Sequence, residues 1–474
     1  MDIWTPNISE RPGPKYKAIA DSILSDIRSG GLAPGERLPT HRDLAYRLGV
    51  TVGTVTRAYS EAERRGLVAG EVGRGTYVRD PKFPTAGSYV EEKFSISVKN
   101  AEHLSDGICD FSLSLPASGI AEKFFAQALS NISGSDNLGA LLDYTPDAGL
   151  PSHRQAGAAW IKSTSGMDVS PEQIIITNGA QHAITAAVMA LTVSGDTILS
   201  ECLTYHGIKT LSSELGLKLI GLEMDEFGLT PESFEAACKA HTPKLLYTIA
   251  TMQTPTARTM PLERRKAIAK IAAHYNVAII EDDIFRALCK DAPDPISTLA
   301  PDICYYVTSF SKCISPGLRY GFIAVPKGME ARVSSVIRDT CRMATPLMAE
   351  IVTQWIENGG AAEISKMQRN EIAARQQIAE RILKGLDYEM HKGSFVILLY
   401  PPEPWREEEF AIAAKEKGVL VIPASVFAVG HASPRHAVRI CLGAASGRDL
   451  VEKGLKELAG LVRYGNNAYA ESIV

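Results

Sequence analysis

The first 80 residues place apolar side chains at helical spacing and then at strand spacing. Three isoleucines lie four residues apart on one face of an expected helix: Ile19, Ile23 and Ile27. Thr40 opens a second expected helix with a capping-box-like start, and Gly49 ends it. A third helix begins at Thr51. Its apolar face carries three residues: Val55, Tyr59 and Ala62. Residues 66–78 then predict a two-stranded hairpin.

Beyond residue 108, apolar runs that end in polar residues predict buried parallel strands. Residues 277–280 are apolar and are followed by the acidic residues 281–283, as in a strand buried on both faces that opens onto a site. Shorter runs of this kind occupy three segments: residues 174–177, 197–199 and 305–307. Residues 330–386 are mainly amphipathic helix, and residues 393–459 mix short strands with helices.

The composition is that of a reduced, globular protein. The chain of 474 residues has room for about three domains, and 45% of its residues are hydrophobic. Because no run of 18 apolar residues and no signal-peptide pattern occurs, we expect a cytoplasmic protein without a membrane span. None of the eight cysteines forms a Cys-x-x-Cys pair, which favours reduced thiols over disulfides or a metal site.

Charge is distributed unevenly between the two ends of the chain. The net charge is −4, but residues 1–80 hold 12 basic and 10 acidic side chains, a balance of +2, which leaves −6 for the remainder. This bias is mild. Attraction to nucleic-acid phosphates would therefore depend on where individual arginines lie rather than on a bulk basic field.

The most specific chemistry lies just beyond residue 307. Two hydroxyls, an amine and a guanidinium occur close together as Ser309, Ser311, Lys312 and Arg319. This set suits a phosphorylated aldehyde, pyridoxal 5'-phosphate (PLP). Lys312 would form a Schiff base with the aldehyde, while the other three side chains would hold the phosphate. Taken alone, the same residues could be a solvated Lys and Arg beside a loop.

Three other strand ends add compatible groups. Asp282 is a candidate partner for the pyridinium nitrogen, because a nearby carboxylate favours the protonated ring. Gly179, Ala180 and Gln181 open a helix whose N–H groups would face a phosphate. Tyr205 would stack on the pyridine ring. Each feature alone is weak, since loop tyrosines and Gly-Ala turns usually serve packing.

From about Asp110 to the C-terminus, the chain resembles the aspartate-aminotransferase fold of fold type I PLP proteins. The elements above occur in the family's order, and residues 247–265 match its Asn-Pro-Thr-Gly loop region. The resemblance implies the roles already given and adds two. Tyr144 matches a tyrosine that reaches the phosphate across a dimer interface, and Arg439 matches an arginine that holds a substrate carboxylate.

Two departures from this family bear on activity. Thr254 stands where the family has Asn, and Ile284 and Phe285 stand where it usually has Tyr. Both positions contact the 3'-oxygen of the cofactor in the family, and each lost hydrogen bond is worth about 0.5–1.5 kcal/mol. We therefore expect the chain to bind PLP and to show at most weak transaminase activity.

Residues 14–78 resemble the winged helix of the GntR regulators. Two motifs carry the resemblance: the segment 38–42 and a Gly-Arg-Gly-Thr wing at 73–76. The resemblance implies that the helix beginning at Thr51 reads DNA, although Val52 replaces a frequent Arg. The residues expected at DNA bases, backbone or minor groove are Arg42, Thr51, Thr54, Thr56, Arg57 and Arg74. A winged helix used only for protein contacts is the alternative.

Both halves together resemble the MocR group of GntR regulators, which join a winged helix to an aminotransferase-like domain. The resemblance implies four segments: a winged helix-turn-helix (1–80), a linker (81–108), a PLP-binding large α/β domain with a mostly parallel sheet (109–330) and a small C-terminal α/β domain (331–474).

The function implied is that of a homodimeric, PLP-dependent transcription regulator. It would bind a double-stranded DNA operator and sense an amine or an amino acid. One alternative is a working aminotransferase with an appended DNA-binding domain. Another is a regulator that reports the supply of PLP itself.

Overall fold

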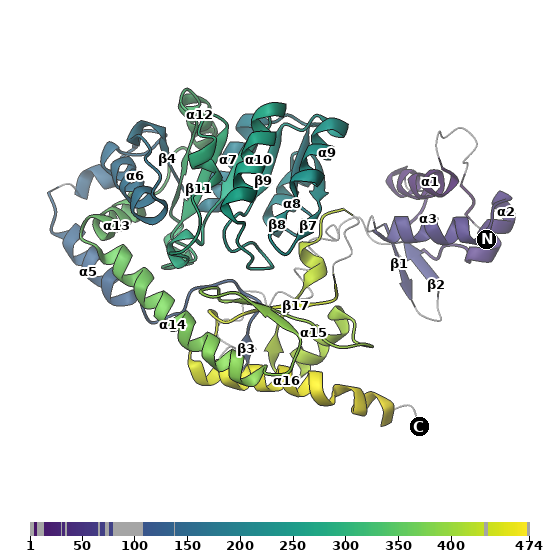
Figure 1. Cartoon of the computed structure of the whole chain (residues 1–474). Helices are drawn as coiled ribbons and strands as arrows, with labels where there is room; N and C mark the ends of the chain where they lie inside the picture. The colour runs from purple at the N-terminus through teal and green to yellow at the C-terminus, as the bar shows by residue number, and fades with distance from the viewer. Residues whose placement is uncertain are drawn as a thin grey trace. The chain divides into compact units, whose positions relative to one another are not determined.

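Contacts divide the computed structural model into two units, Met1–Asn100 and Ala101–Val474 (Figure 1). The structure describes residues 4–6, 14–29, 31–33, 36–64, 67–71, 75–78, 108–136, 138–430 and 435–471. Arg74 and residues 81–107 of the expected linker lie outside the described residues. Within the described part of the chain, no helix is long and apolar enough to cross a membrane.

The described residues of the first unit form three helices and an antiparallel hairpin that share one core. The elements are α1 (Lys15–Ser29), α2 (His41–Leu48), α3 (Val52–Arg64), β1 (Val68–Glu71) and β2 (Gly75–Val78). Ile19 and Val55 are fully buried, as their spacing predicts. Thr40 Oγ1 accepts a hydrogen bond from the N–H of Asp43 at 3.2 Å, and Gly49 ends α2 with φ +60°. The predicted helix-turn-helix and hairpin are therefore confirmed.

A seven-stranded sheet forms the centre of the second unit. Its strands, in spatial order, are β4 (Ile174–Thr177), β12 (Gly321–Ala324), β11 (Cys304–Ser309), β10 (Ala278–Asp282), β9 (Leu245–Thr248), β5 (Thr197–Glu201) and β6 (Lys218–Leu222). β12 runs antiparallel to both of its neighbours, and the other pairs are parallel. The predicted mostly parallel sheet is confirmed.

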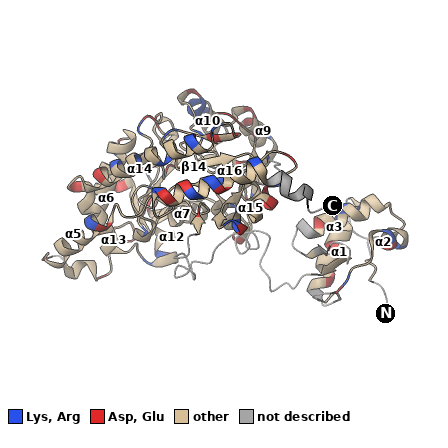
Figure 2. Ribbon diagram, turned by 90° about the horizontal axis from the view of Figure 1, so that it is seen from below, with Lys and Arg blue, Asp and Glu red and all other residues tan. Residues whose placement is uncertain are grey.

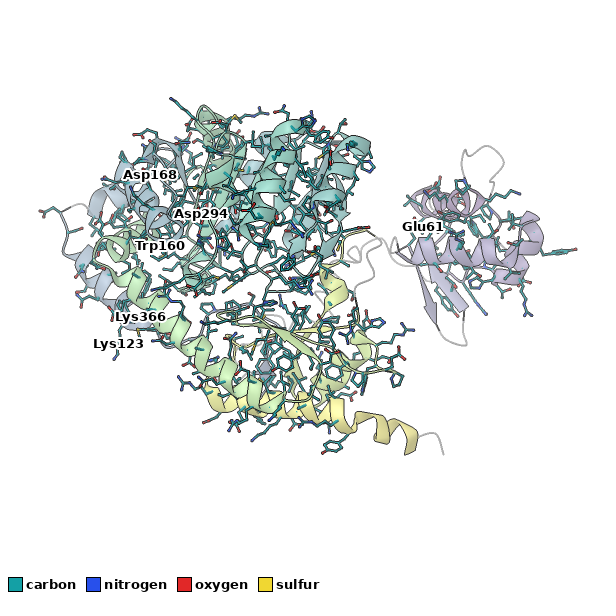
Figure 3. All side chains as sticks on the ribbon, in the orientation of Figure 1. Glu61, Lys123, Trp160, Asp168, Asp294 and Lys366 are labelled. Atoms are coloured by element: carbon teal, nitrogen blue, oxygen red, sulfur yellow. The ribbon has the colours of Figure 1, made fainter. Side chains whose placement is uncertain are left out.

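Helices cover both faces of this sheet (Figure 1). One face packs on α7 (Ala180–Leu191), α8 (His206–Glu214) and α12 (Glu330–Cys341), and the other on α9 (Pro231–His241), α10 (Leu262–Tyr275) and α11 (Ile296–Leu299). Side chains alternate between the faces along each strand, so Ile280 packs toward α7 and Ile279 toward α10. Figure 3 shows how densely these side chains fill the unit.

A second, four-stranded sheet lies in the C-terminal part of the unit. Its antiparallel strands are β13 (Tyr388–Met390), β14 (Val396–Leu399), β17 (Val438–Cys441) and β16 (Ile422–Pro423). The helices of this part are α14 (Gly360–Ile382), α15 (Glu407–Glu416) and α16 (Arg448–Glu471). Figure 2 shows basic and acidic residues along the ribbon of α16, and Glu452 there forms ion pairs with Arg381 and Lys456.

The expected division at residue 330 stays a prediction, and two contacts lie across the expected boundaries. β3 (Cys109–Asp110) pairs in parallel with β15 (Val419–Leu420), and α12 packs on α7 and β4. The remaining helices and strands are α5 (Glu122–Ser133), α6 (Pro151–Ser165), α13 (Pro346–Glu357), β7 (Met224–Asp225) and β8 (Gly228–Leu229). Short turns of 3-10 helix occupy Leu138–Leu141, Pro171–Gln173, Arg286–Leu288, Pro316–Leu318 and Ala424–Phe427.

Candidate functional site

Most of the residues predicted to bind a cofactor line one cavity. The cavity has a volume of about 280 Å³ and lies beyond the carboxyl ends of β10 and β11. Ten predicted residues line it: Ala180, Gln181, Tyr205, Thr254, Asp282, Ser309, Ser311, Lys312, Arg319 and Arg439. The fold thus brings together groups that are up to 259 residues apart in the sequence, from Ala180 to Arg439.

Aromatic packing holds the segment that carries Lys312. The ring of Phe310, next to the end of β11, packs against Trp160 of α6 at 4.9 Å and against Tyr320 at 5.8 Å, measured between ring centroids. Lys312 Nζ donates a hydrogen bond to the carbonyl of Ser114 at 2.6 Å. Burial lowers the pKa of Lys312 to about 8, so its amine is partly neutral near physiological pH. A neutral amine is the form that attacks an aldehyde.

Close to Lys312, the start of α7 and the side chain of Arg319 form a cradle suited to a phosphate. α7 begins at Ala180, after Gly179 with φ +84°. A Cβ atom at Gly179 would lie 3.0 Å from Nη2 of Arg319, so only glycine leaves this approach unstrained. Arg319 Nη2 donates to the carbonyl of Asn178 at 3.1 Å. Backbone N–H groups at a helix start together with a guanidinium suit a phosphate.

Asp282 occupies the end of β10 and is buried. Its Oδ2 accepts a hydrogen bond of 2.7 Å from the phenol of Tyr247 on β9, whereas its Oδ1 has no hydrogen-bond partner among the described residues. Burial raises the pKa of Asp282 to about 6, and the Tyr247 hydrogen bond opposes this rise. No sequence pattern marks Tyr247 as a site residue, because its partner lies 35 positions away.

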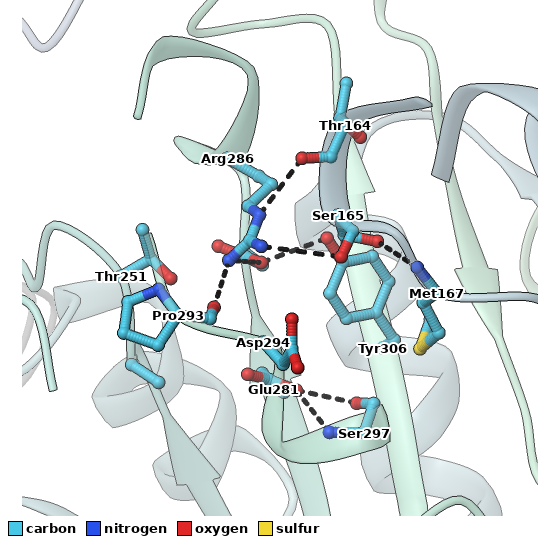
Figure 4. Close-up of polar contacts among 12 residues, drawn as sticks. Thr164, Ser165, Met167, Thr251, Glu281, Arg286, Pro293, Asp294, Ser297 and Tyr306 are labelled. Carbon is cyan, nitrogen blue, oxygen red and sulfur yellow. Dashed lines mark hydrogen bonds and ion pairs between the residues drawn. The ribbon is translucent and has the colours of Figure 1, made fainter. Parts of the chain in front are cut away.

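The acids on either side of Asp282 do not line the cavity and have other partners, as Figure 4 shows for Glu281 and Ser297. Glu281 accepts hydrogen bonds from the N–H and hydroxyl of Ser297 at 2.8 and 2.7 Å. Asp283 accepts one from the phenol of Tyr306 at 3.0 Å. Strand alternation therefore aims only the middle acid of the three at the cavity.

Arg439 and Tyr205 also line the cavity. Arg439 of β17 lies over the ring of Phe427 at 4.8 Å and donates from Nη2 to the carbonyl of Ser112, but its Nε has no partner among the described residues. The ring of Tyr205 lies 4.7 Å from that of His206. Burial and the nearby cations lower the pKa of His206 to about 4. His206 also lines the cavity and was not predicted.

The residues at the two positions where this chain departs from the resembled family form part of the cavity wall. Thr254, Ile284 and Phe285 line the cavity, and Phe285 packs edge-on against Phe395 at 5.7 Å. This part of the wall is therefore apolar at the position where the aspartate-aminotransferase fold family usually has the phenol of a Tyr. Tyr144 lies outside the cavity, 74% exposed, with Arg342 stacked 5.5 Å from its ring centroid. Its expected contact with a partner subunit's cofactor stays a prediction.

The donor and acceptor set fits PLP. Besides Asp282 Oδ1 and Arg439 Nε, two buried cavity atoms have no hydrogen-bond partner among the described residues: Ser309 Oγ and Gln181 Oε1. Buried polar atoms normally have partners, so unpartnered ones that line a cavity indicate a ligand. An amine, a carboxylate and a phosphate cradle are the groups that PLP requires.

In the first unit, α3 presents the predicted DNA-reading residues. Thr51, Thr56 and Arg57 are exposed, and Thr54 is half-buried. Thr51 Oγ1 accepts a hydrogen bond from the N–H of Thr54 at 3.2 Å, and Thr56 Oγ1 donates to the carbonyl of Val52 at 3.0 Å. The Thr51 hydroxyl therefore caps this helix, and the hydroxyl of Thr56 is engaged by the helix backbone.

Basic and aromatic side chains lie beside these threonines. Arg57 Cζ lies 4.9 Å from the ring centroid of Tyr16 on α1, a contact that the sequence pattern did not predict. Arg42 is exposed on α2, where Figure 2 shows basic residues. Tyr46, four residues further on the same helix, is 91% exposed and is an additional candidate for DNA contact.

Comparison with known proteins identifies a family for each of the two units. The family model "Aminotransferase class I and II" matches residues 125–458, and "Bacterial regulatory proteins, gntR family" matches residues 15–78. The HTH-type transcriptional regulator YdeF of Bacillus subtilis is 30% identical over 97% of this chain and 96% of its own length. MocR of Rhizobium meliloti, a "probable rhizopine catabolism regulatory protein", is 25% identical over 77% of this chain and 76% of its own.

Solved structures agree on the fold of the second unit. An archaeal alanine:glyoxylate aminotransferase matches with a TM-score of 0.72 and 23% identity, over 80% of this chain and 96% of its own. LysN, an alpha-aminoadipate aminotransferase from Thermus thermophilus, matches with a TM-score of 0.70 and 23% identity, over 82% of this chain and 98% of its own.

Fold and cavity thus define a winged helix-turn-helix regulator whose second unit has the PLP-dependent aminotransferase fold. The chain belongs to the aminotransferase class I and II family and, over nearly its whole length, to the MocR group of GntR-type transcriptional regulators. The predicted fold class, family and PLP dependence are confirmed.

Proposed function

We propose that this chain regulates transcription by sensing an amine or amino acid at the PLP site of its second unit. The observation that carries the proposal is the cavity in which Lys312, Asp282 and the Arg319 cradle converge, in a chain that also has a GntR helix-turn-helix. The proposal assigns the cavity to recognition and the helix-turn-helix to output.

The proposal rests on a few cavity residues, each with its own task. Asp282 would hold the ring nitrogen, Tyr205 would stack on the ring, and Arg319 with the start of α7 would hold the phosphate. When bound, PLP supplies an aldehyde for which the amines of Lys312 and of an effector compete. Arg439, with its unpartnered Nε, would bind a carboxylate on that effector.

Sensing requires two arrangements that differ in their affinity for the effector. A ligand that binds both equally would shift nothing. We propose that the chain acts as a homodimer and that effector binding favours one arrangement of the paired aminotransferase units, which respaces the two winged helices on an operator. Two related helix-turn-helix units would then protect two half-sites of DNA.

The second candidate function is aminotransferase catalysis. It is favoured by the presence of Lys312, Asp282 and Arg439 together, and by relatives such as the 2-aminoadipate transaminase of Thermus thermophilus, 26% identical over 68% of this chain. The apolar Ile284–Phe285 wall opposes it, because no phenol is available there to hold the 3'-oxygen of the cofactor.

A combined ligand screen tests the proposal. Amines and amino acids are added to the PLP-bound protein while the visible absorbance of the cofactor and a band shift on DNA upstream of its own gene are recorded. We expect at least one amine to change both signals at the same concentrations. Cofactor changes without any change in DNA binding, for every amine tested, would contradict a sensing role.

A further inference from the structure

Tyr247 has no role in the assignments above, yet its side chain forms a hydrogen bond with the cavity acid, Asp282. Its phenol donates to Oδ2 of Asp282 at 2.7 Å, and both side chains are buried. The register of the sheet fixes this geometry: Tyr247 of β9 pairs with Ile280 of β10, two positions before Asp282 on the same face. The other carboxylate oxygen, Oδ1, is left without a partner among the described residues and Asp282 lines the cavity.

The surroundings keep Tyr247 in its neutral, donating form. Burial and the neighbouring carboxylates of Asp282 and Glu201 raise the pKa of Tyr247. Glu201 of β5 is occupied by other donors, the Thr248 hydroxyl at 2.6 Å and the Ile249 N–H at 3.0 Å. The remaining charged groups that act on Asp282 are Lys312, which favours its ionised form, and Asp283, which opposes it.

We propose that Tyr247 is a positioning residue for the cofactor ring: its hydroxyl holds Oδ2 of Asp282, so that Oδ1 is the oxygen presented to the pyridinium N–H. This rests on the proposed PLP site and extends it to a residue on the neighbouring strand. Removing the donor costs the buried carboxylate its side-chain hydrogen bond and leaves the backbone N–H of Ile284 as its other hydrogen-bonding neighbour. The ring nitrogen then loses its oriented, ionised partner.

The sheet provides a matched control on its other face. Tyr306 of β11 is also buried, and its phenol donates to Oδ2 of Asp283 at 3.0 Å. Asp283 belongs to the same acidic run but does not line the cavity. Tyr247→Phe and Tyr306→Phe therefore remove the same atom from the same kind of buried hydrogen bond, on opposite faces of the sheet.

The test compares the two variants as full-length protein. The dissociation constant of PLP is measured by equilibrium dialysis between pH 5.5 and 8.5, and thermal unfolding of the cofactor-free forms reports their stability. We expect Tyr247→Phe to weaken PLP binding about tenfold or more, because hydrogen bonds to charged groups are the strong ones. The loss should grow as the pH falls, since Asp282 then protonates more readily. Tyr306→Phe should lower the thermal stability and leave the dissociation constant of PLP unchanged.

A cofactor analogue separates positioning from general damage. In 1-deaza-PLP the ring nitrogen is replaced by carbon, so Tyr247→Phe should change its affinity far less than that of PLP. The ratio of the affinities for PLP and for 1-deaza-PLP is measured on the same protein. A loss of stability affects both affinities and therefore cancels in this ratio. Equal losses for both ligands, or equal losses of PLP affinity in both variants, would overturn the proposal for Tyr247. Failure of the unaltered chain to bind PLP would instead overturn the proposed function.

Discussion

The guanidinium of Arg57 on α3 lies over the ring of Tyr16 on α1, with 4.9 Å between Cζ and the ring centroid. The contact orients an exposed arginine of the helix that we propose to read DNA, before any DNA is bound. Arg57 also lies on the face opposite the buried Val55 and Tyr59. An arginine held in place loses less freedom when it binds a base or phosphate.

Arg57→Ala should weaken binding to the specific operator by about 1–3 kcal/mol and relax sequence preference, if Arg57 reads a base. Arg42→Ala should weaken binding to all duplexes alike and reduce the magnitude of the salt slope by about one. Fluorescence anisotropy with operator and scrambled duplexes at several salt concentrations measures both. Unchanged DNA binding in both variants would mean that this face of the winged helix does not contact DNA.

Lys312 should be the residue that is covalently linked to the cofactor. Borohydride reduction of the PLP-bound protein followed by peptide mapping should label Lys312, and Lys312→Ala should abolish the label. The variant should retain part of its PLP affinity through the Arg319 cradle and the start of α7. Labelling of a different lysine would show that the site is assigned wrongly.

The lowered pKa of Lys312 also predicts how cofactor-free stability depends on pH. The folded chain gives up this proton at a pH of about 8, whereas the unfolded chain holds it up to its ordinary value of 10.5. The free energy of unfolding due to this group should therefore rise between those values and be lowest below pH 8. Lys312→Met should stabilise the cofactor-free protein at pH 7 and less so at pH 10, as measured by denaturant unfolding. A larger gain at pH 10 would contradict the assignment.

Gly179→Ala should weaken PLP binding, because the added Cβ would lie 3.0 Å from Arg319 Nη2 at a φ of +84°. Gly195→Ala is the control, since Gly195 has a similar φ of +94° but no atom within 4 Å of an added Cβ. Both substitutions strain the backbone, but only the first displaces the cradle. PLP affinity measured by dialysis should fall in the first variant alone. An equal fall in both would attribute the effect to strain.

Features with local causes could be predicted from the sequence. The cap at Thr40, the strand that ends in Asp282 and the segment that carries Lys312 each follow from residues within a few positions of one another. The Tyr247–Asp282 hydrogen bond could not be predicted, because it depends on the register of two strands. The pairing of Cys109 with Val419 is another such case, since it joins segments 310 residues apart.

Footprinting of the PLP-bound protein on its own upstream DNA tests whether the occupancy of the PLP cavity controls DNA binding. Footprints are recorded across a titration of an amino acid that changes the visible absorbance of the cofactor, with Arg439→Gln as the variant that should require more ligand. We expect protection of two half-sites that changes over the same concentration range as the absorbance. A footprint that stays constant while the absorbance changes, together with transamination at rates of about 1–1000 per second, would contradict it.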